Sequence, residues 1–404
     1  MVQLAVCLIL AFVSAQAAWK AGAASVDITP TESIWLAGYG ARDKPSESVR
    51  GPLYAKALAL QDDSGAVSVM VTLDLIGMRP RWTDPVTIKV RDRLHVAPER
   101  LIYNASHTHS GPVIDHPGTY RDKMGARVDH HSQVIQRYTK SLQDKLYSVI
   151  EQAIGSLAPA TLKFEQGFAG FAVNRRRVGR REFPGPVDHD VPVLGIRNAA
   201  GNVTAILFGY ACHNTIMGDY TIHGDYAGYA EAALQQRFPA SVALFVQGAG
   251  ADANPLPRRR AEHLERYGTT LTDAVEEVLR GKMRPVNGPL RAAAETIELA
   301  LNPEGTHPYP VQAWRFADSL TLLALGGELT VDYALRFKAK YGWNQLWVAG
   351  YSNDVFAYIP SLRVLREGGY EAQGVLVANA RRPFAEDVEE RIAAAVDRVM
   401  RKLQ

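Results

Sequence analysis

The alternation of short apolar runs with longer amphipathic stretches is the feature that most restricts how this chain can fold. The short runs are rich in β-branched residues and are bounded by turn-forming residues, which is typical of buried β-strands. We predict strands at Ala55–Gln61, Val67–Leu75, Leu101–Ala105, Val191–Ile196, Val203–Tyr210, Val242–Gln247, Leu320–Leu325 and Leu346–Ala349.

The longer stretches predict α-helices, because their apolar residues recur every three or four positions. Alternating strands and helices indicate an α/β or α+β fold in which a mixed β-sheet is covered by helices. No linker or internal repeat interrupts the pattern, so we expect residues 19–404 to form one domain. The predicted helices are Asp84–Leu94, Ser132–Ile154, Asp225–Phe238, Ala261–Leu279, Val331–Lys340 and Ala385–Leu403.

The N-terminal segment differs in kind from the rest of the chain. Val2–Val13 is apolar and uncharged, and the small residues Ser14–Ala18 follow it. This pattern predicts a secretory signal over residues 1–18 and a secreted or periplasmic protein, although the segment lacks an initial Lys or Arg. A buried N-terminal helix is the alternative.

The charge pattern gives no indication of a nucleic-acid partner. The net charge is +3, and the basic run Arg175–Arg181 is broken by Val178 and Gly179. Such a short run lacks the continuous basic surface that binds nucleic acids. This Arg-rich stretch, up to Val187, and Asp115–His131 form long connections, which we expect to line or cover a functional site.

Two cysteines occur, Cys7 and Cys212, and removal of the signal would leave no internal disulfide. Cys212 precedes His213 and could be read as a nucleophile. It ends an apolar run, however, where a free cysteine is usually a small buried hydrophobic residue. We favour the second interpretation.

Two histidines follow the predicted strand Leu101–Ala105, separated by one residue, in the segment Ser106–Pro112. In an extended chain, residues i and i+2 point to the same side, so His107 and His109 are expected to face one pocket. Both could bind a metal, or one could bind it while the other transfers protons. The motif alone fits a pair of surface histidines equally well.

Other strand ends carry further candidate ligands. His213 follows Val203–Tyr210, and two strands that each end in histidine suit a metal pocket at one edge of a sheet. The glycine-rich turn Gln247–Pro255 is expected to bring backbone donors and Asp252 or Asn254 near that pocket. Glu328 follows Leu320–Leu325 and is either a partner of the next helix terminus or a third metal ligand.

Taken in order, these motifs resemble the catalytic domain of the neutral/alkaline (non-lysosomal) ceramidases. The resemblance runs from about residue 20 to residue 370 and covers nearly the whole mature chain. The matching segments are Ala23–Pro30, Leu36–Gly40, Pro52–Ala57, Ser106–Pro112, Asn174–Arg175, Tyr210–His213, Gly224–Gly228, Gln247–Gly248 and Gly326–Glu328.

The resemblance implies a single Zn²⁺ per chain, held by two histidines, one glutamate and one tyrosine. His107, His213 and Glu328 match the first three ligands. Tyr358, within Tyr351–Pro360, is the best match for the fourth. The residues that the resemblance places beside the metal, in contact with the scissile group, are His109, Arg175 and Tyr370.

The resemblance also implies hydrolysis of an N-acyl lipid or amine, and hence a transient contact with a membrane surface. Two departures bear on the lipid substrate: the family's C-terminal β-sandwich domain is missing, and the interval from His213 to Glu328 is short. One alternative is a two-metal amidohydrolase or esterase that also uses His109 with His223, Asp225 or Asp252. Another is a non-catalytic lipid- or glycan-binding protein on the same fold.

Overall fold

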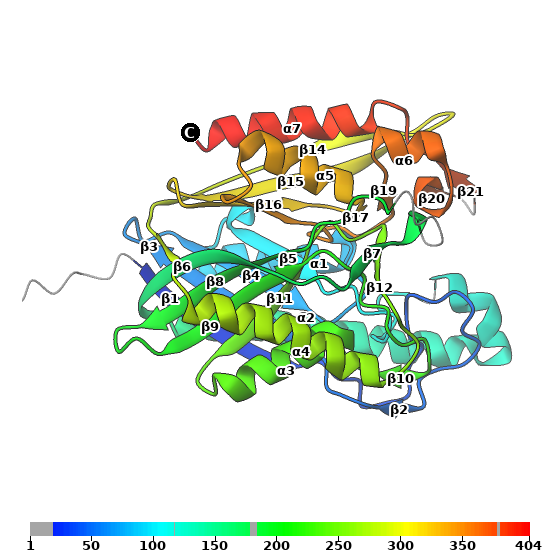
Figure 1. The fold of residues 1–404 in the computed structure, drawn as a ribbon. Helices are drawn as coiled ribbons and strands as arrows, with labels where there is room; N and C mark the ends of the chain where they lie inside the picture. Colours follow the sequence, from blue (N-terminus) through cyan, green and yellow to red (C-terminus); the bar gives the residue numbers. More distant parts are fainter. Residues whose placement is uncertain (1–18, 117, 178–183, 378–379) are drawn as a thin grey trace, which may run out of the picture.

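The computed structural model describes residues 19–116, 118–177, 184–377 and 380–404. The predicted signal, residues 1–18, therefore lies outside the described residues, and its cleavage stays a prediction. Two β-sheets and the helices on their outer faces form four layers (Figure 1). The predicted α/β class with a mixed sheet is confirmed.

The larger sheet has the strand order β11-β9-β8-β6-β1-β3-β4-β5, with β13 paired to β6. The pairs β4–β5 and β9–β11 are parallel, and the other pairs are antiparallel. Its strands are β1 (Trp19–Asp27), β3 (Tyr54–Asp62), β4 (Val67–Leu73), β5 (Leu101–Ala105), β6 (Ala158–Phe168), β8 (Asp190–Asn198), β9 (Val203–Tyr210), β11 (Val242–Gln247) and β13 (Arg284–Val286).

The smaller sheet packs on one face of the larger one. It consists of β14 (Leu290–Ala300), β15 (Thr306–Phe316), β16 (Leu320–Leu325) and β18 (Leu346–Ala349), in that order. Successive side chains point to opposite faces of a strand, so the residues of β9 pack alternately against the layers on its two sides. Leu207 packs with residues of the smaller sheet, whereas Phe208 packs under helices.

Helices cover both outer faces. α1 (Pro80–Leu94), α2 (Val128–Gly155), α3 (Asp225–Arg237) and α4 (Glu262–Arg280) pack on the larger sheet, and α5 (Val331–Tyr341) and α7 (Val388–Lys402) pack on the smaller one. Figure 1 shows α7 along one side of the molecule and α3 and α4 along the other. Among the described residues, no helix combines the length and apolar character that a bilayer span requires.

The larger sheet curls, so that strands far apart in its order meet at their ends. The side-chain oxygen of Asn104, in β5, accepts a hydrogen bond from the Gln247 backbone N–H of β11 at 2.8 Å. The side-chain NH2 of Asn104 donates to Gly350 O at 2.7 Å. The histidines were expected to meet at strand ends. β5 lies at one edge of the sheet order and β9 near the opposite one, and the curl brings the ends of these two strands together.

Candidate metal centre

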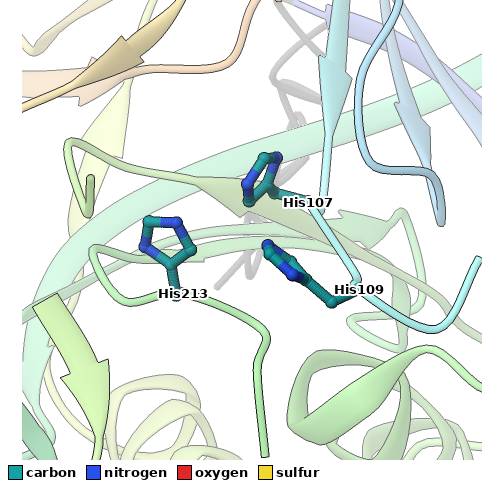
Figure 2. Close-up of side chains that lie close together, drawn as sticks. All are labelled: His107, His109 and His213. Atoms are coloured by element: carbon teal, nitrogen blue, oxygen red, sulfur yellow. The ribbon is translucent and has the colours of Figure 1, made fainter. Parts of the chain in front are cut away.

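Three buried histidine side chains converge where β5 and β9 end (Figure 2). One potential ligand atom from each of His107, His109 and His213 lies within 4.8 Å of the others. The ring centroids of His107 and His213 are 5.0 Å apart, and those of His109 and His213 are 5.8 Å apart. The structure therefore joins the two sequence motifs into one centre.

Backbone carbonyls orient two of these rings. His107 Nδ1 lies 2.5 Å from Ile76 O, and His213 Nδ1 lies 2.7 Å from Gly250 O. A carbonyl oxygen can only accept, so each Nδ1 carries the proton and each Nε2 presents its lone pair to the centre. The glycine-rich turn thus contributes a carbonyl acceptor to His213, in place of the expected backbone donors.

The Glu328 carboxylate completes this arrangement. Its Oε2 lies 3.1 Å from His107 Nε2 and 3.2 Å from His213 Nε2. The contact with His107 lacks the alignment of a hydrogen bond, and that buried nitrogen has no other partner among the described residues. Glu328 is not the cap of α5, which begins at Val331 after Thr330.

Three electron-pair donors that meet this closely repel one another unless a cation lies between them. Burial, reinforced by Arg175, lowers the pKa of His213 to about 4, so this imidazole is neutral at pH 7 and cannot be that cation. Neutral imidazoles and an ionised carboxylate are the donor set of a zinc site.

His109 differs from the other two histidines. Both of its ring nitrogens are buried without a hydrogen-bond partner in the part of the chain that the structure describes. Burial, together with His107 and His213, lowers its pKa well below the usual value. Its ring packs against Tyr39 at 4.7 Å and against the backbone of Gly38. It is therefore free either to bind a metal or to transfer a proton.

Two tyrosines lie near the centre. Tyr358 belongs to β19 (Tyr358–Ile359), and its ring stacks on that of His213 at 6.3 Å. Tyr351, which we did not single out from the sequence, has its ring 4.6 Å from that of His107. Its hydroxyl is buried and has no partner among the described residues, so Tyr351 is a second candidate for a fourth ligand.

Arg175 and Tyr370 lie on the open side of the centre. The guanidinium carbon of Arg175 is 5.3 Å from the Tyr358 ring centroid and 5.7 Å from that of Tyr370. Glu371, another residue that sequence reasoning missed, accepts from Arg175 Nε at 2.8 Å. Although burial lowers the pKa of Arg175, Tyr358 and Glu371 raise it overall, so the guanidinium remains charged.

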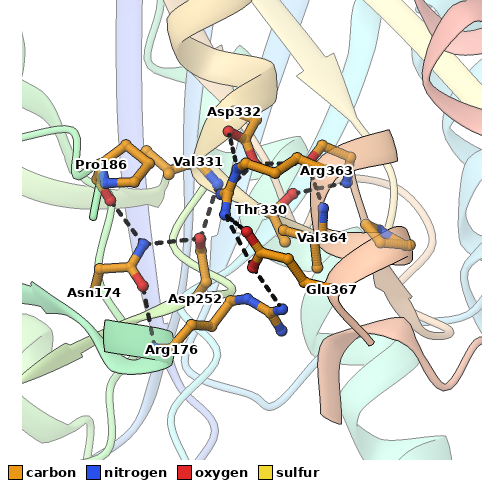
Figure 3. Close-up of polar contacts among 12 residues, drawn as sticks. Asn174, Arg176, Pro186, Asp252, Thr330, Val331, Asp332, Arg363, Val364 and Glu367 are labelled. Carbon is orange, nitrogen blue, oxygen red and sulfur yellow. Dashed lines mark hydrogen bonds and ion pairs between the residues drawn. The ribbon is translucent and has the colours of Figure 1, made fainter. Parts of the chain in front are cut away.

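A polar network holds Asp252 outside the centre (Figure 3). One Asp252 oxygen accepts from the Val331 N–H at 2.8 Å, and the other accepts from the Asn174 amide at 3.1 Å. Asp252 thereby joins the start of α5 to β7 (Ala172–Asn174), directly before Arg175. In the described residues, it is not part of the histidine group.

The other two residues of the two-metal alternative also lie outside that group. Asp225 accepts from the backbone N–H groups of Ile216 and Tyr226, at 3.0 and 2.9 Å. His223 Nδ1 accepts from the Asp225 N–H at 3.0 Å. Both side chains therefore stabilise the start of α3.

Two cavities flank the centre. An open cavity of about 890 Å³ reaches His109, Arg175, Tyr358 and Tyr370. A second, of about 280 Å³, reaches His107 and Glu328 from the other side. The two long connections line these cavities as expected: Arg175, Arg176 and Arg177 border the first, and Asp115, His116, Gly118 and Tyr120 border the second.

The sequence profile for the N-terminal region of neutral/alkaline non-lysosomal ceramidases matches residues 19–255, more than half of the chain. The chain belongs to this family. A comparison with curated proteins gives no match. Family membership supports a hydrolase, and the histidine group is able to hold the metal on which a neutral ceramidase depends.

Two solved structures share the fold. A neutral ceramidase from Pseudomonas aeruginosa superposes with a TM-score of 0.79 at 17% sequence identity. A ceramidase complexed with C2 gives a TM-score of 0.78 at 16% identity. In both comparisons the alignment covers 95% of this chain and 75% of the other.

Cys212 is buried, as the sequence predicted. Cys212 is free and fully buried among apolar residues, and burial raises the pKa of its thiol well above the usual value. A buried, protonated thiol is a poor nucleophile. Cys212 is therefore a buried core residue, as expected from the sequence.

Proposed function

We propose that the protein is a zinc-dependent amide hydrolase that cleaves an N-acyl linkage, that of ceramide or of a related N-acyl lipid or amine, into a carboxylate and an amine. The approach of His107 and His213 Nε2 to a single oxygen of Glu328 is the observation that carries the proposal. Family membership supplies the reaction class.

His107, His213 and Glu328 would hold the ion, with Tyr358 as the fourth ligand. Zinc bound there would polarise the amide carbonyl and lower the pKa of a water molecule. The carbonyls of Ile76 and Gly250 keep the two imidazoles oriented toward the ion.

The other residues act on charge and protons. Arg175 is held by Glu371, and its buried Nη2 has no hydrogen-bond partner among the described residues. It lies near Tyr358, where it can donate to a developing oxyanion. Tyr370, at the cavity wall, is placed to contact the same group. His109 borders the same cavity, and its neutral imidazole can pass a proton to the leaving amine.

The decisive experiment measures bound zinc and the hydrolysis of N-acylsphingosines and simpler N-acyl amines, for the wild type and for His107→Ala. We expect one zinc per wild-type chain, and loss of both zinc and activity in the variant. Full zinc and full activity in His107→Ala would refute the proposal. Cleavage of simple N-acyl amines without cleavage of ceramide would retain the chemistry and reject the sphingolipid substrate.

A two-metal amidohydrolase or esterase is the second candidate, because the ligand atoms of His109 lie as near as those of His107 and His213. Two zinc ions per chain would support it. The proposal has two further parts. One is export through the predicted signal, and the other is contact with a membrane surface during lipid hydrolysis.

A further inference from the structure

The cavity of about 890 Å³ beside His109 is strongly cationic. Of the residues that the structure describes, five arginines and two glutamates border it, whereas a wall made for a ceramide headgroup would need hydroxyl partners and no net charge. The arginines are Arg175, Arg176, Arg177, Arg258 and Arg259, and the glutamates are Glu367 and Glu371.

The two glutamates form ion pairs with three of these five arginines. Glu371 Oε1 lies 2.8 Å from Arg175 Nε, and Glu367 lies 3.0 Å from Arg176 and 2.6 Å from Arg177. These ion pairs fix the side of the cavity formed by η3 (Arg175–Arg177). Neither glutamate forms an ion pair with the arginines of the opposite side.

Arg258 and Arg259 form that opposite side, and within the described residues neither has a carboxylate within ion-pair distance. The backbone fixes the turn that carries them: Arg259 has a left-handed φ of 76°, and its N–H donates to Ile216 O at 2.7 Å. Burial and the neighbouring Arg259 lower the pKa of Arg258, and Tyr39 and Asp225 oppose this effect. The two adjacent positive charges repel each other. An anion between them would relieve that repulsion.

The position of Arg259 relates this charge to the reaction centre. Its guanidinium carbon lies 4.7 Å from the Tyr39 ring centroid, and that ring lies 4.7 Å from the ring of His109. Both groups therefore contact the same tyrosine and border the same cavity, so one substrate molecule can reach His109 and Arg259 together.

The second cavity, of about 280 Å³, has the opposite character. Its walls include Ile76, Val113, Ile114 and Phe356. Its two arginines are both neutralised, because Arg79 pairs with Asp354 and Arg81 pairs with Asp115. This side, next to His107 and Glu328, suits the acyl chain and leaves the cationic cavity for the amine half.

We infer that the substrate is an N-acyl amine whose amine half carries an anionic group, a carboxylate or a phosphate, bound by Arg258 and Arg259. N-acyl amino acids and N-acyl phosphoamines are the chemical classes that fit. The inference rests on the proposed amide hydrolysis and specifies its substrate. It also assigns the two arginines as residues that determine specificity.

The test compares three soluble amides with the same acyl chain: N-octanoylglycine, N-octanoylphosphoethanolamine and the neutral N-octanoylethanolamine. We expect kcat/KM of at least one anionic amide to exceed that of the neutral amide by about 10-fold or more. The double variant Arg258→Gln/Arg259→Gln should reduce that ratio to near one. Arg260→Gln, an exposed neighbour that pairs with Glu262, is the matched control and should keep the wild-type ratio.

The outcomes separate this inference from the proposed function. A preference for the glycine amide identifies a carboxylate substrate, and a preference for the phosphoamine identifies a phosphate. Equal kcat/KM for all three amides, or a ratio that the double variant leaves unchanged, overturns the inference. If none of the three amides is cleaved, calorimetric binding of the same compounds decides the inference: arginine-dependent preference for the anions supports it, and equal dissociation constants overturn it. The proposed function itself fails only if N-acylsphingosines are not hydrolysed either.

Discussion

Glu328 and Tyr358 are direct partners in the parallel ladder of β17 (Glu328–Leu329) and β19 (Tyr358–Ile359). Partners in a ladder point to the same face, so this register sets the carboxylate and the phenol side by side next to His213. A shift of one residue would turn Tyr358 away from the centre. Two short strands thus place Tyr358 beside the carboxylate that we propose as a metal ligand.

This register predicts different effects for the two tyrosines near the centre. Tyr358→Phe should weaken zinc binding by about 10-fold or more, because it removes the proposed fourth ligand. Tyr351→Phe, which deletes a fully buried hydroxyl near His107, is the control and should keep the wild-type zinc affinity. Competition with a chromogenic chelator measures both. If Tyr351→Phe weakens zinc binding and Tyr358→Phe does not, Tyr351 is the ligand.

His109 and His107 are expected to separate metal binding from proton transfer. His109→Gln should keep one zinc per chain and lower kcat by about 10²- to 10⁴-fold, the usual size of a lost general acid. His107→Ala, the control, should lose the metal itself. Zinc analysis combined with steady-state kinetics distinguishes them. A loss of bound zinc in His109→Gln would indicate that His109 is a ligand.

Much of the fold follows from the sequence, because buried strands have a local signature. Predicted and observed bounds coincide for β5, β9, β11, β16 and β18. The long hairpin of β14 and β15 escaped prediction. β14 is rich in alanine and glutamate, and β15 contains Pro308 and Pro310 in a part that pairs on one side only, where proline is tolerated.

The site was harder to assemble from sequence than the strands. His107 and His213 each follow a predictable strand. The short distance between them depends on the curl of the larger sheet, which no local sequence pattern encodes. The ladder partner of Glu328 is equally non-local. Arg258 and Arg259 gave no signal, since their role depends on the absence of nearby carboxylates among the described residues and not on a motif.

Gly38 is expected to be essential for the position of His109. Its φ is +94°, and a Cβ placed there would lie 2.5 Å from the His109 ring, far inside contact distance. Gly38→Ala should therefore lower kcat by displacing the imidazole, while zinc content stays at the wild-type level. Gly40→Ala, where nothing lies within 4 Å of the added atom, is the control. Equal activity of both variants would contradict this role.

His223 is expected to make the folded state sensitive to acid. Burial lowers its pKa to about 4, with Arg50 and Arg42 adding to the effect and Asp219 opposing it. The unfolded chain has the ordinary value of about 6.5 and so binds more protons between these two pH values. Stability is therefore complete above about pH 6.5 and is lost as the pH falls toward 4.

The size and the origin of this loss can be measured with one substitution. Two and a half pH units correspond to about 3 kcal/mol in the free energy of unfolding. His223→Asn can still accept the Asp225 N–H bond through its amide oxygen but has no proton to gain. Urea unfolding of the wild type and the variant, between about pH 7.5 and pH 4.5, should show a steeper decline for the wild type. Parallel declines would mean that His223 is protonated equally in both states, and that the acid sensitivity arises at His109 and His213.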